Sequence, residues 1–275
     1  MINNQMKEAK LKTVGFIITN STTTLYQNVY GETNGISEKT PFVIGSITKS
    51  FTSLALLKLN ISLNQTLDNF NLGDYLDEEL LKDITVGELL NHTSGLDSFS
   101  SRRIADKGNY SYSNYGFGLL GKIIEQKSNE KYSDFVKNEI FKPLNMINSH
   151  AAYNSAIIDS YDNFLGFCSK YKSLESEYKF NDGFYISAGY ISVPIEDMGY
   201  YLRFYLNKDN KQYASQITEG KVEVGYNIKY GMGMVIANRS DYIKYNHSGA
   251  TASFLSQMYI YPDIDIGFFV VINNI

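Results

Sequence analysis

Residues 42–59 of the 275-residue chain read FVIGSITKSFTSLALLKL, a short apolar run that passes through a glycine into a strongly apolar segment. Apolar residues recur three or four positions apart there, so we expect a helix over 47–59. Ser46 and Lys49 open this helix, and their separation of three places both side chains on one face. The pair predicts a serine activated by a lysine whose pKa is lowered by burial.

On either side of this region, both ends of the chain are typical of β-structure. Residues 14–19 (VGFIIT) and 24–30 (TLYQNVY) flank a polar turn, which predicts a hairpin. Four more strand-like runs, separated by turn-forming residues, lie at 231–237, 242–246, 253–260 and 266–272. Further helical periodicity occurs in the middle of the chain, at 115–125, 131–141 and 194–206. We expect Ser192 to cap the last of these helices.

This order of strands and helices predicts an α/β fold of the α+β type. A mostly antiparallel sheet would be assembled from both chain ends and flanked by helices, with a helical subdomain inserted between them. We expect residues 1–58 and 208–275 to form a discontinuous, sheet-containing subdomain and residues 59–207 to form the mainly helical one. The active site is expected in the crevice between the two.

Charge and cysteine content exclude several classes of function. The 25 basic and 29 acidic side chains give a formal net charge of -4, and no basic block is present, so nucleic-acid binding is not expected. The single Cys168 and the scattered His92, His150 and His247 lack metal-site spacing, so we expect neither a metal nor a cofactor. No window approaches the roughly 18 apolar residues of a membrane span. A signal peptide or anchor lost from the ends stays an open alternative.

Two further patterns supply partners for the serine and the lysine. Residues 112–114 (YSN) precede the 115–125 helix; a phenol can shuttle protons if a nearby cation favours its phenolate, and an Asn amide offers both donor and acceptor. Residues 247–249 (HSG) form the only His-x-Gly of the chain. The glycine would let a substrate backbone approach the sheet edge, and the next amide, on Ala250, would donate to an oxyanion together with the Ser46 amide.

Each of these patterns is weak by itself. Ser-x-x-Lys also begins at Ser128, Ser169 and Ser176, and Tyr-x-Asn recurs elsewhere. Only Ser46 follows a glycine and starts an apolar helix, whereas the other serines lie in polar stretches that are typical of solvated surface. Context therefore selects Ser46. Cys168 has no neighbouring His or basic cluster, so we expect a passive thiol.

The three patterns in this order, together with residues 84–96 (ITVGELLNHTSGL), resemble the serine β-lactamase and penicillin-binding-protein superfamily. Within it the chain is most similar to the class C-like branch, which includes D-alanyl-D-alanine carboxypeptidases, D-aminopeptidases and related esterases. The resemblance runs from about Val14 to Asn274. It implies a β-lactamase/transpeptidase-like fold and a serine hydrolase that forms an acyl-enzyme.

The resemblance also implies roles for individual residues. Ser46 would be the acylated nucleophile and Lys49 its proton acceptor or electrostatic activator. Tyr112 would relay a proton to the leaving group, and Asn114 would hold Lys49 and the acyl amide of the substrate. His247, where many relatives have Lys, would support Tyr112 and line the substrate channel. Substrate and oxyanion contacts would come from Ser248, Gly249 and Ala250. His92 is expected to pin a loop by hydrogen bonds.

Three departures from the family pattern are visible. Only 15 residues separate Leu96 from Tyr112, where many relatives carry a longer insert, so we expect an unusually open cleft rim. Relatives usually continue after the last strand into a helix packed on the sheet, so that helix is expected to be missing or replaced. His247 lacks the permanent charge of Lys, which weakens recognition of a β-lactam or peptide carboxylate.

Two classes of function follow. The first is an enzyme that hydrolyses a small-molecule or peptide substrate through an acyl-Ser46 ester, on a peptide, amide or ester, with a true β-lactamase as a variant. The second is a sensor or binding domain that a β-lactam acylates without turnover. The intact Ser46, Lys49 and Tyr112 favour the enzyme. The family resemblance places such a protein in the cell envelope or outside the cell.

Overall fold

The computed structural model describes residues 2–9, 11–31, 36–151, 183–251 and 254–273. The described strands are β1 (Thr13–Thr19), β2 (Thr24–Gly31), β3 (Phe42–Val43), β4 (Ser192–Val193), β5 (Val222–Gly225), β6 (Ile228–Tyr230), β7 (Val235–Asn238), β8 (Ile243–Ala250), β9 (Phe254–Tyr261) and β10 (Ile266–Asn273). The described helices are α1 (Ile2–Glu8), α2 (Thr48–Lys58), α3 (Glu78–Asp83), α4 (Val86–Leu90), α5 (Asn114–Ser128), α6 (Tyr132–Val136), α9 (Ile186–Gly189), α10 (Ile195–Leu206) and α11 (Lys211–Ile217).

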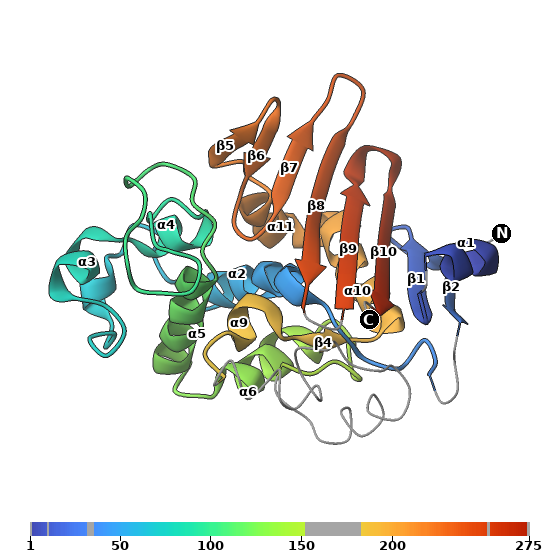
Figure 1. Cartoon of the computed structure of the whole chain (residues 1–275), viewed down its shortest axis with the longest axis horizontal. Coiled ribbons are helices and arrows are strands. Elements are labelled where there is room, and N and C mark those ends of the chain that lie inside the picture. The colour runs from blue at the N-terminus through green and yellow to red at the C-terminus, as the bar shows by residue number, and fades with distance from the viewer. Residues whose placement is uncertain (1, 10, 32–35, 152–182, 252–253, 274–275) are drawn as a thin grey trace.

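One antiparallel sheet combines the two ends of the chain (Figure 1). Within the described residues it has eight strands in the order β2-β1-β10-β9-β8-β7-β6-β5. β1 pairs with β10 in the register Val14↔Ile272 to Thr19↔Gly267, so the first strand of the chain lies beside the last. The expected α+β fold, with a mostly antiparallel sheet built from both ends and flanked by helices, is confirmed.

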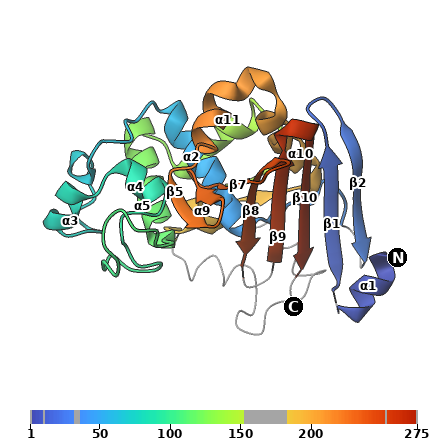
Figure 2. The same cartoon turned by 90° about the horizontal axis from the view of Figure 1, so that it is seen from above.

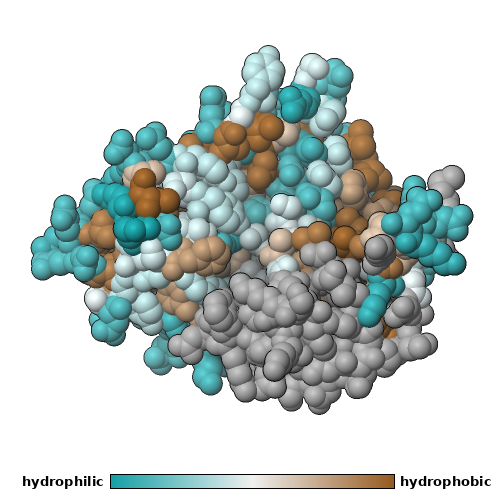
Figure 3. Space-filling view, viewed as in Figure 1, coloured by the Kyte–Doolittle hydropathy of each residue, from teal (hydrophilic) through white to brown (hydrophobic). Residues whose placement is uncertain are grey.

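Helix α10 packs against one face of the sheet, on β1, β9 and β10 (Figure 2). Glycines on the strands make room for it: a Cβ at Gly15 would lie 2.8 Å from Ile195 Cγ2, and one at Gly267 would lie 3.1 Å from Leu202 Cβ. The strands bury alternate residues toward this side, which gives the sheet one covered face. The other face carries hydrophobic side chains over β9 and β10 (Figure 3), including the partly exposed Leu255.

The expected helices occupy the middle of the chain. The periodicity at 47–59, 115–125 and 194–206 corresponds to α2, α5 and α10. The run at 131–141 forms α6 followed by a short π-helical segment, Lys137–Phe141. α2 packs on α5, α9 and α11, so it lies at the centre of the molecule and carries the candidate nucleophile to the end of β8. The division into 1–58 with 208–275 and 59–207 stays a prediction, although α10 packs on the sheet.

Two local expectations are wrong, and two strands were missed. Ser192 does not cap α10, because it lies in β4, where it pairs with Val43 of β3, and Pro194 occupies the N-cap position instead. The run at 231–237 does not form one strand: Gly231 N–H donates to the Met234 carbonyl, which closes a turn between β6 and β7. β5 and β6 were missed because their alternation mixes exposed polar side chains with few apolar ones.

Candidate active site

Ser46 lies in a single 3-10 turn, Gly45–Ile47, that leads directly into α2. Gly45 has a φ of 55°, and a Cβ there would lie 2.4 Å from the Ala250 amide nitrogen. Glycine is therefore required for the end of β8 to pack against this turn. Lys49 lies in the first turn of α2 and has no exposed surface. The serine–lysine pair thus sits where the helical part of the chain meets the sheet.

Three oxygen atoms surround Lys49 Nζ. It lies 3.1 Å from Ser46 Oγ, 2.7 Å from Asn114 Oδ1 and 2.7 Å from the Ala188 carbonyl oxygen. Burial holds the pKa of Lys49 well below its ordinary value. A neutral amine has two N–H donors, which match the two short contacts to oxygens that only accept. Its lone pair then faces the Ser46 hydroxyl, ready to take the proton.

Tyr112 packs against the same lysine. Lys49 Nζ lies 4.8 Å from the centre of the Tyr112 ring, and the Tyr112 side chain forms a hydrogen bond with Ser46. Burial raises the pKa of Tyr112, and the hydrogen bond with Ser46 offsets this only in part. Burial therefore favours the neutral phenol, and a phenolate at Tyr112 would need a charge on Lys49.

Asn114 is held by the segment that precedes it. Ser113 caps α5 by accepting a hydrogen bond from Gly116 N–H at 3.0 Å. The two ends of the Asn114 amide have different partners: Oδ1 accepts from Lys49, and Nδ2 donates to Ser98 Oγ at 3.0 Å. The expected contact with Lys49 is present. The second amide hydrogen of Asn114 remains for a ligand in the pocket.

His247 is placed differently from the expectation. Its Nε2 lies 3.0 Å from Tyr230 Oη, and its Nδ1 lies 2.6 Å from the Ser248 carbonyl oxygen. The side chain is 5% exposed, and burial lowers the pKa of His247 to about 4. Both ring nitrogens are thus used inside the protein. The predicted roles of His247, supporting Tyr112 and lining the substrate channel, stay predictions, because the β8 pleat turns the ring inward to these two partners.

The backbone of β8 forms one wall of the site. A Cβ at Gly249 would lie 1.9 Å from the Ile44 carbonyl oxygen, so this glycine admits the chain's own backbone rather than that of a substrate. The next residue, Ala250, lines a pocket of about 110 Å³ together with Ser46 and Asn114. Ser248 and Gly249 instead line a separate hollow over β9 and β10. Of the three predicted substrate contacts, only Ala250 reaches the Ser46 pocket.

The short segment 97–111 reaches the pocket in spite of its length. Phe99 lines the pocket and packs edge-on against Tyr185 with ring centres 5.8 Å apart, while Tyr185 Oη donates to the Phe99 carbonyl at 3.2 Å. The rim on this side is therefore formed by two aromatic rings. How open the rim is compared with relatives stays a prediction, although Phe99 brings this segment into the lining of the pocket.

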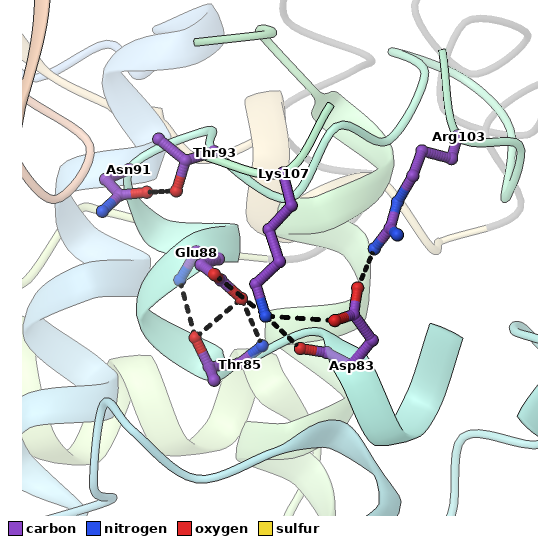
Figure 4. Close-up of polar contacts among 7 residues, drawn as sticks. All are labelled: Asp83, Thr85, Glu88, Asn91, Thr93, Arg103 and Lys107. Atoms are coloured by element: carbon purple, nitrogen blue, oxygen red, sulfur yellow. Dashed lines mark hydrogen bonds and ion pairs between the residues drawn. The ribbon is translucent and has the colours of Figure 1, made fainter. Parts of the chain in front are cut away.

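Ion pairs fasten the same segment to α3 and α4 (Figure 4). Arg103 Nη2 lies 2.5 Å from Asp83 Oδ2. Lys107 Nζ donates to the Asp83 carbonyl at 2.5 Å and lies 3.3 Å from Glu88 Oε1. The Arg103 guanidinium holds the pKa of Asp83 below its usual range. Glu88 also completes a capping box with Thr85 at the start of α4, so the anchor itself is rigid.

His92 pins the end of this segment, as expected. Its carbonyl accepts from Ser111 N–H at 2.8 Å, and its Nδ1 accepts from Ser113 N–H at 3.1 Å. The competing serine at Ser128 donates to the Ile124 carbonyl at the C-terminal end of α5, the helix that begins at Asn114. Ser169, Ser176 and Cys168 lie outside the described residues.

Sequence reasoning missed several residues of the site. Tyr230 joins His92 to His247, Ala188 supplies a carbonyl to Lys49, and Phe99 and Tyr185 form the rim. The signal for Tyr230 was the adjacent Gly-x-Gly at 231–233. A Cβ at Gly233 would lie 2.6 Å from the Lys49 carbonyl oxygen, which fixes this turn against α2.

In the described ranges, no group of three His, Cys, Asp or Glu side chains is arranged to hold a metal ion. None of the described helices is both long and apolar enough to cross a membrane.

Known proteins resemble the chain in sequence and in fold. Protein flp of Staphylococcus aureus is 26% identical over an alignment covering 86% of this chain and 53% of flp, so the chain spans about half of that relative. The octameric penicillin-binding protein homologue of Pyrococcus abyssi superposes with a TM-score of 0.81 at 23% identity, over 99% of this chain and 72% of that one. A class C β-lactamase superposes with a TM-score of 0.80 at 18% identity, over 99% and 89%.

These structural likenesses establish the fold. The family assignment rests on more than fold. The family model described as Beta-lactamase matches residues 1–274, which is nearly the whole chain. The resemblance read from the serine, tyrosine and histidine motifs is thereby confirmed, and the chain belongs to the beta-lactamase family.

Proposed function

We propose that the chain is a serine hydrolase that works through an acyl-enzyme at Ser46. One observation carries the proposal: Lys49 Nζ, buried and hydrogen-bonded to Asn114 and Ala188, lies 3.1 Å from Ser46 Oγ. A serine hydroxyl is a weak nucleophile until a base takes its proton, and a lysine that burial keeps neutral is such a base. Membership of the beta-lactamase family supports acyl transfer at a serine.

The chemistry proceeds in two steps. Ser46 Oγ attacks the substrate carbonyl carbon as Lys49 Nζ takes the hydroxyl proton, and the Ser46 and Ala250 amides donate to the resulting oxyanion. The bond to the leaving group breaks as Tyr112 gives it a proton, and Tyr112 is reprotonated from Lys49. A water molecule then attacks the ester, Lys49 with Tyr112 accepts its proton, and Ser46 leaves with that proton as a free hydroxyl.

The substrate we propose is a small ester or a D-amino-acid peptide rather than a β-lactam. Among the residues that the structure describes, those lining the Ser46 pocket include Phe99, Tyr185 and Tyr190 but no charged side chain. His247, with its pKa near 4, is neutral at pH 7 and gives a carboxylate no ion-pair partner. The proposal extends to a location in the cell envelope or outside the cell, which rests on the family alone.

Intact-mass measurement tests the proposal. The protein is incubated with a fluorophosphonate and, separately, with a β-lactam, and Ser46→Ala is compared with Ser128→Ala. We expect a fluorophosphonate adduct and ester hydrolysis in the parent protein and in Ser128→Ala, and neither in Ser46→Ala. An adduct that persists in Ser46→Ala contradicts the choice of nucleophile.

The β-lactam arm separates the alternatives. Rapid, multiple-turnover hydrolysis of a chromogenic cephalosporin with negligible esterase activity identifies a true β-lactamase and overturns our ranking. A stoichiometric β-lactam adduct that never clears, together with no ester hydrolysis, identifies a sensor or binding domain. Slow or absent cephalosporin turnover beside ester hydrolysis is the result we expect.

A further inference from the structure

Two histidines and a tyrosine form a buried hydrogen-bond chain behind the reactive residues. Tyr230 Oη lies 3.2 Å from His92 Nε2 and 3.0 Å from His247 Nε2. Tyr230 is 1% exposed, His92 has no exposed surface, and His247 is 5% exposed. The three rings also pack on one another, with centres 4.8 Å apart for His92 and Tyr230 and 5.9 Å apart for Tyr230 and His247.

Backbone groups at both ends fix the direction of this chain. Ser113 N–H can only donate, so His92 Nδ1 must accept, and a neutral His92 carries its proton on Nε2. His92 Nε2–H therefore donates to Tyr230 Oη, and the Tyr230 hydroxyl donates to His247 Nε2. His247 then carries its proton on Nδ1 and donates it to the Ser248 carbonyl, which can only accept. Every polar atom is satisfied only if the two histidines hold opposite tautomers.

The chain joins two walls of the site. Its first donor, Ser113 N–H, lies between Tyr112 and Asn114, and its last acceptor, the Ser248 carbonyl, lies two residues before the Ala250 amide. Tyr230 is the last residue of β6, and the turn that follows it packs closely on the backbone of Lys49 at Gly233. A change in this hydrogen-bond chain therefore affects Tyr112, the proposed general acid, on one side and the Ala250 amide, the proposed oxyanion donor, on the other.

We propose that Tyr230 is a positioning residue that, by bridging His92 and His247 in opposite neutral tautomers, holds Tyr112 and the Ala250 amide in register around Ser46. Its importance for turnover rests on the proposed function, whereas the tautomer pattern does not. Tyr230 does not touch the reacting atoms. It acts through His92 on the segment carrying Tyr112 and through His247 on the end of β8.

Burial favours the neutral form of both histidines. His92 packs against Tyr110, Tyr112 and Tyr230, and burial is the largest cause that lowers its pKa well below the ordinary value; a charge on Lys49 or His247 would lower it further. His247 faces Tyr230, and burial is the largest cause that lowers its pKa, while its hydrogen bond with the Ser248 carbonyl partly opposes this. No carboxylate acts on either ring within the described part of the chain. Protonation of either histidine replaces an acceptor with a donor and breaks the chain.

Nitrogen-15 NMR of the imidazole rings tests the tautomers without any substrate. The chain has three histidines, and His150→Gln leaves two to assign. We expect His92 protonated on Nε2 and His247 on Nδ1 at neutral pH, a pattern that is lost as the pH falls toward the His247 pKa of about 4. The same tautomer on both rings, or a charged ring at pH 7, overturns the proposal even if no variant can be made.

The variant Tyr230→Phe tests the positioning role, with Tyr226→Phe in the same hairpin as the matched control because its side chain is 84% exposed. We expect Tyr230→Phe to lose the defined His247 tautomer and to lower the acylation rate by about 10- to 100-fold, the scale of a small misplacement of reacting groups. Tyr226→Phe should change neither. A normal acylation rate in a folded Tyr230→Phe protein overturns the positioning role. Correct tautomers in a parent protein that never acylates refute the proposed function instead.

Discussion

Removing Lys49 and Tyr112 singly and together tests whether they handle one proton as a unit. Lys49 Nζ lies 3.1 Å from Ser46 Oγ, and the Tyr112 side chain bonds to the same serine. Burial lowers the pKa of Lys49 and raises that of Tyr112, so the resting pair is a neutral amine beside a neutral phenol. Each is useful only while the other can receive or return the proton.

The expected magnitude follows from this sharing. A positioned acid or base contributes roughly 10²- to 10⁴-fold, which is about 3 to 5 kcal/mol in the activation free energy. Independent action would make the double variant Lys49→Ala/Tyr112→Phe lose about 6 to 10 kcal/mol, the sum of the two losses. Because both residues serve the Ser46 proton, we expect the double variant to lose no more than the worse single variant.

The assay is the rate of Ser46 acylation by an activated ester, followed by intact mass, with circular dichroism to check folding. Tyr110→Phe is the matched control, since it removes a neighbouring phenol that lies near His92 and outside the Ser46 contact. The parent rate should rise with pH as Lys49 loses its proton, at a pH below the ordinary lysine pKa. Additive losses in the double variant would refute the shared proton while leaving Ser46 as nucleophile.

Three further outcomes concern stability and the rim of the pocket. The share of the unfolding free energy that His247 contributes should fall by about 2 kcal/mol between about pH 8 and about pH 5, because unfolded histidine with a pKa near 6.5 takes up a proton before folded His247 does. Urea titrations should show that His247→Gln lessens the fall by this share and leaves the part due to His92, whose pKa burial also lowers, and an equal fall in both proteins contradicts it. Gly45→Ala, strained by its φ of 55° and the 2.4 Å approach to Ala250, should lower the unfolding free energy by about 2 kcal/mol in the same assay, and unchanged stability speaks against the close packing of β8. Arg103→Ala should lower the unfolding free energy by about 1 kcal/mol or less, because the ion pair of Arg103 with Asp83 is partly solvated. The same variant should raise KM, because it loosens the segment that carries Phe99. A KM equal to the parent value argues against this anchor.

The elements of the fold were largely predictable from local pattern. The apolar spacing after Lys49 and the alternation in 14–19 and 266–272 determine a helix and two strands wherever they are placed. β5 and β6 were not predictable in the same way. Their patterns are only four and three residues long, and the strands are stabilised at the edge of the sheet, where β6 pairs with β7 and β5 pairs with β6.

The candidate nucleophile and its partners were also named from sequence, because Ser46 and Lys49 are three residues apart on one helix and that distance is set locally. The positions of the protons could not be named from the sequence. The neutral state of Lys49 depends on burial by α5 and α9, whose residues Asn114 and Ala188 are far away along the chain. The protonation state of Tyr112 could not be predicted for the same reason, since desolvation is a property of the packed interior.

His247 illustrates where the sequence stops and the tertiary structure begins. The sequence by itself showed a single His-x-Gly at 247–249, directly followed by Ala250. In the structure Ala250 is exposed at the end of β8. Only the packed structure decided that the ring points inward to Tyr230, that Gly249 meets the Ile44 carbonyl, and that Ala250 alone reaches the pocket. The physical reason is that a strand's pleat fixes which residues share a face, whereas what each face meets depends on segments brought from elsewhere in the chain.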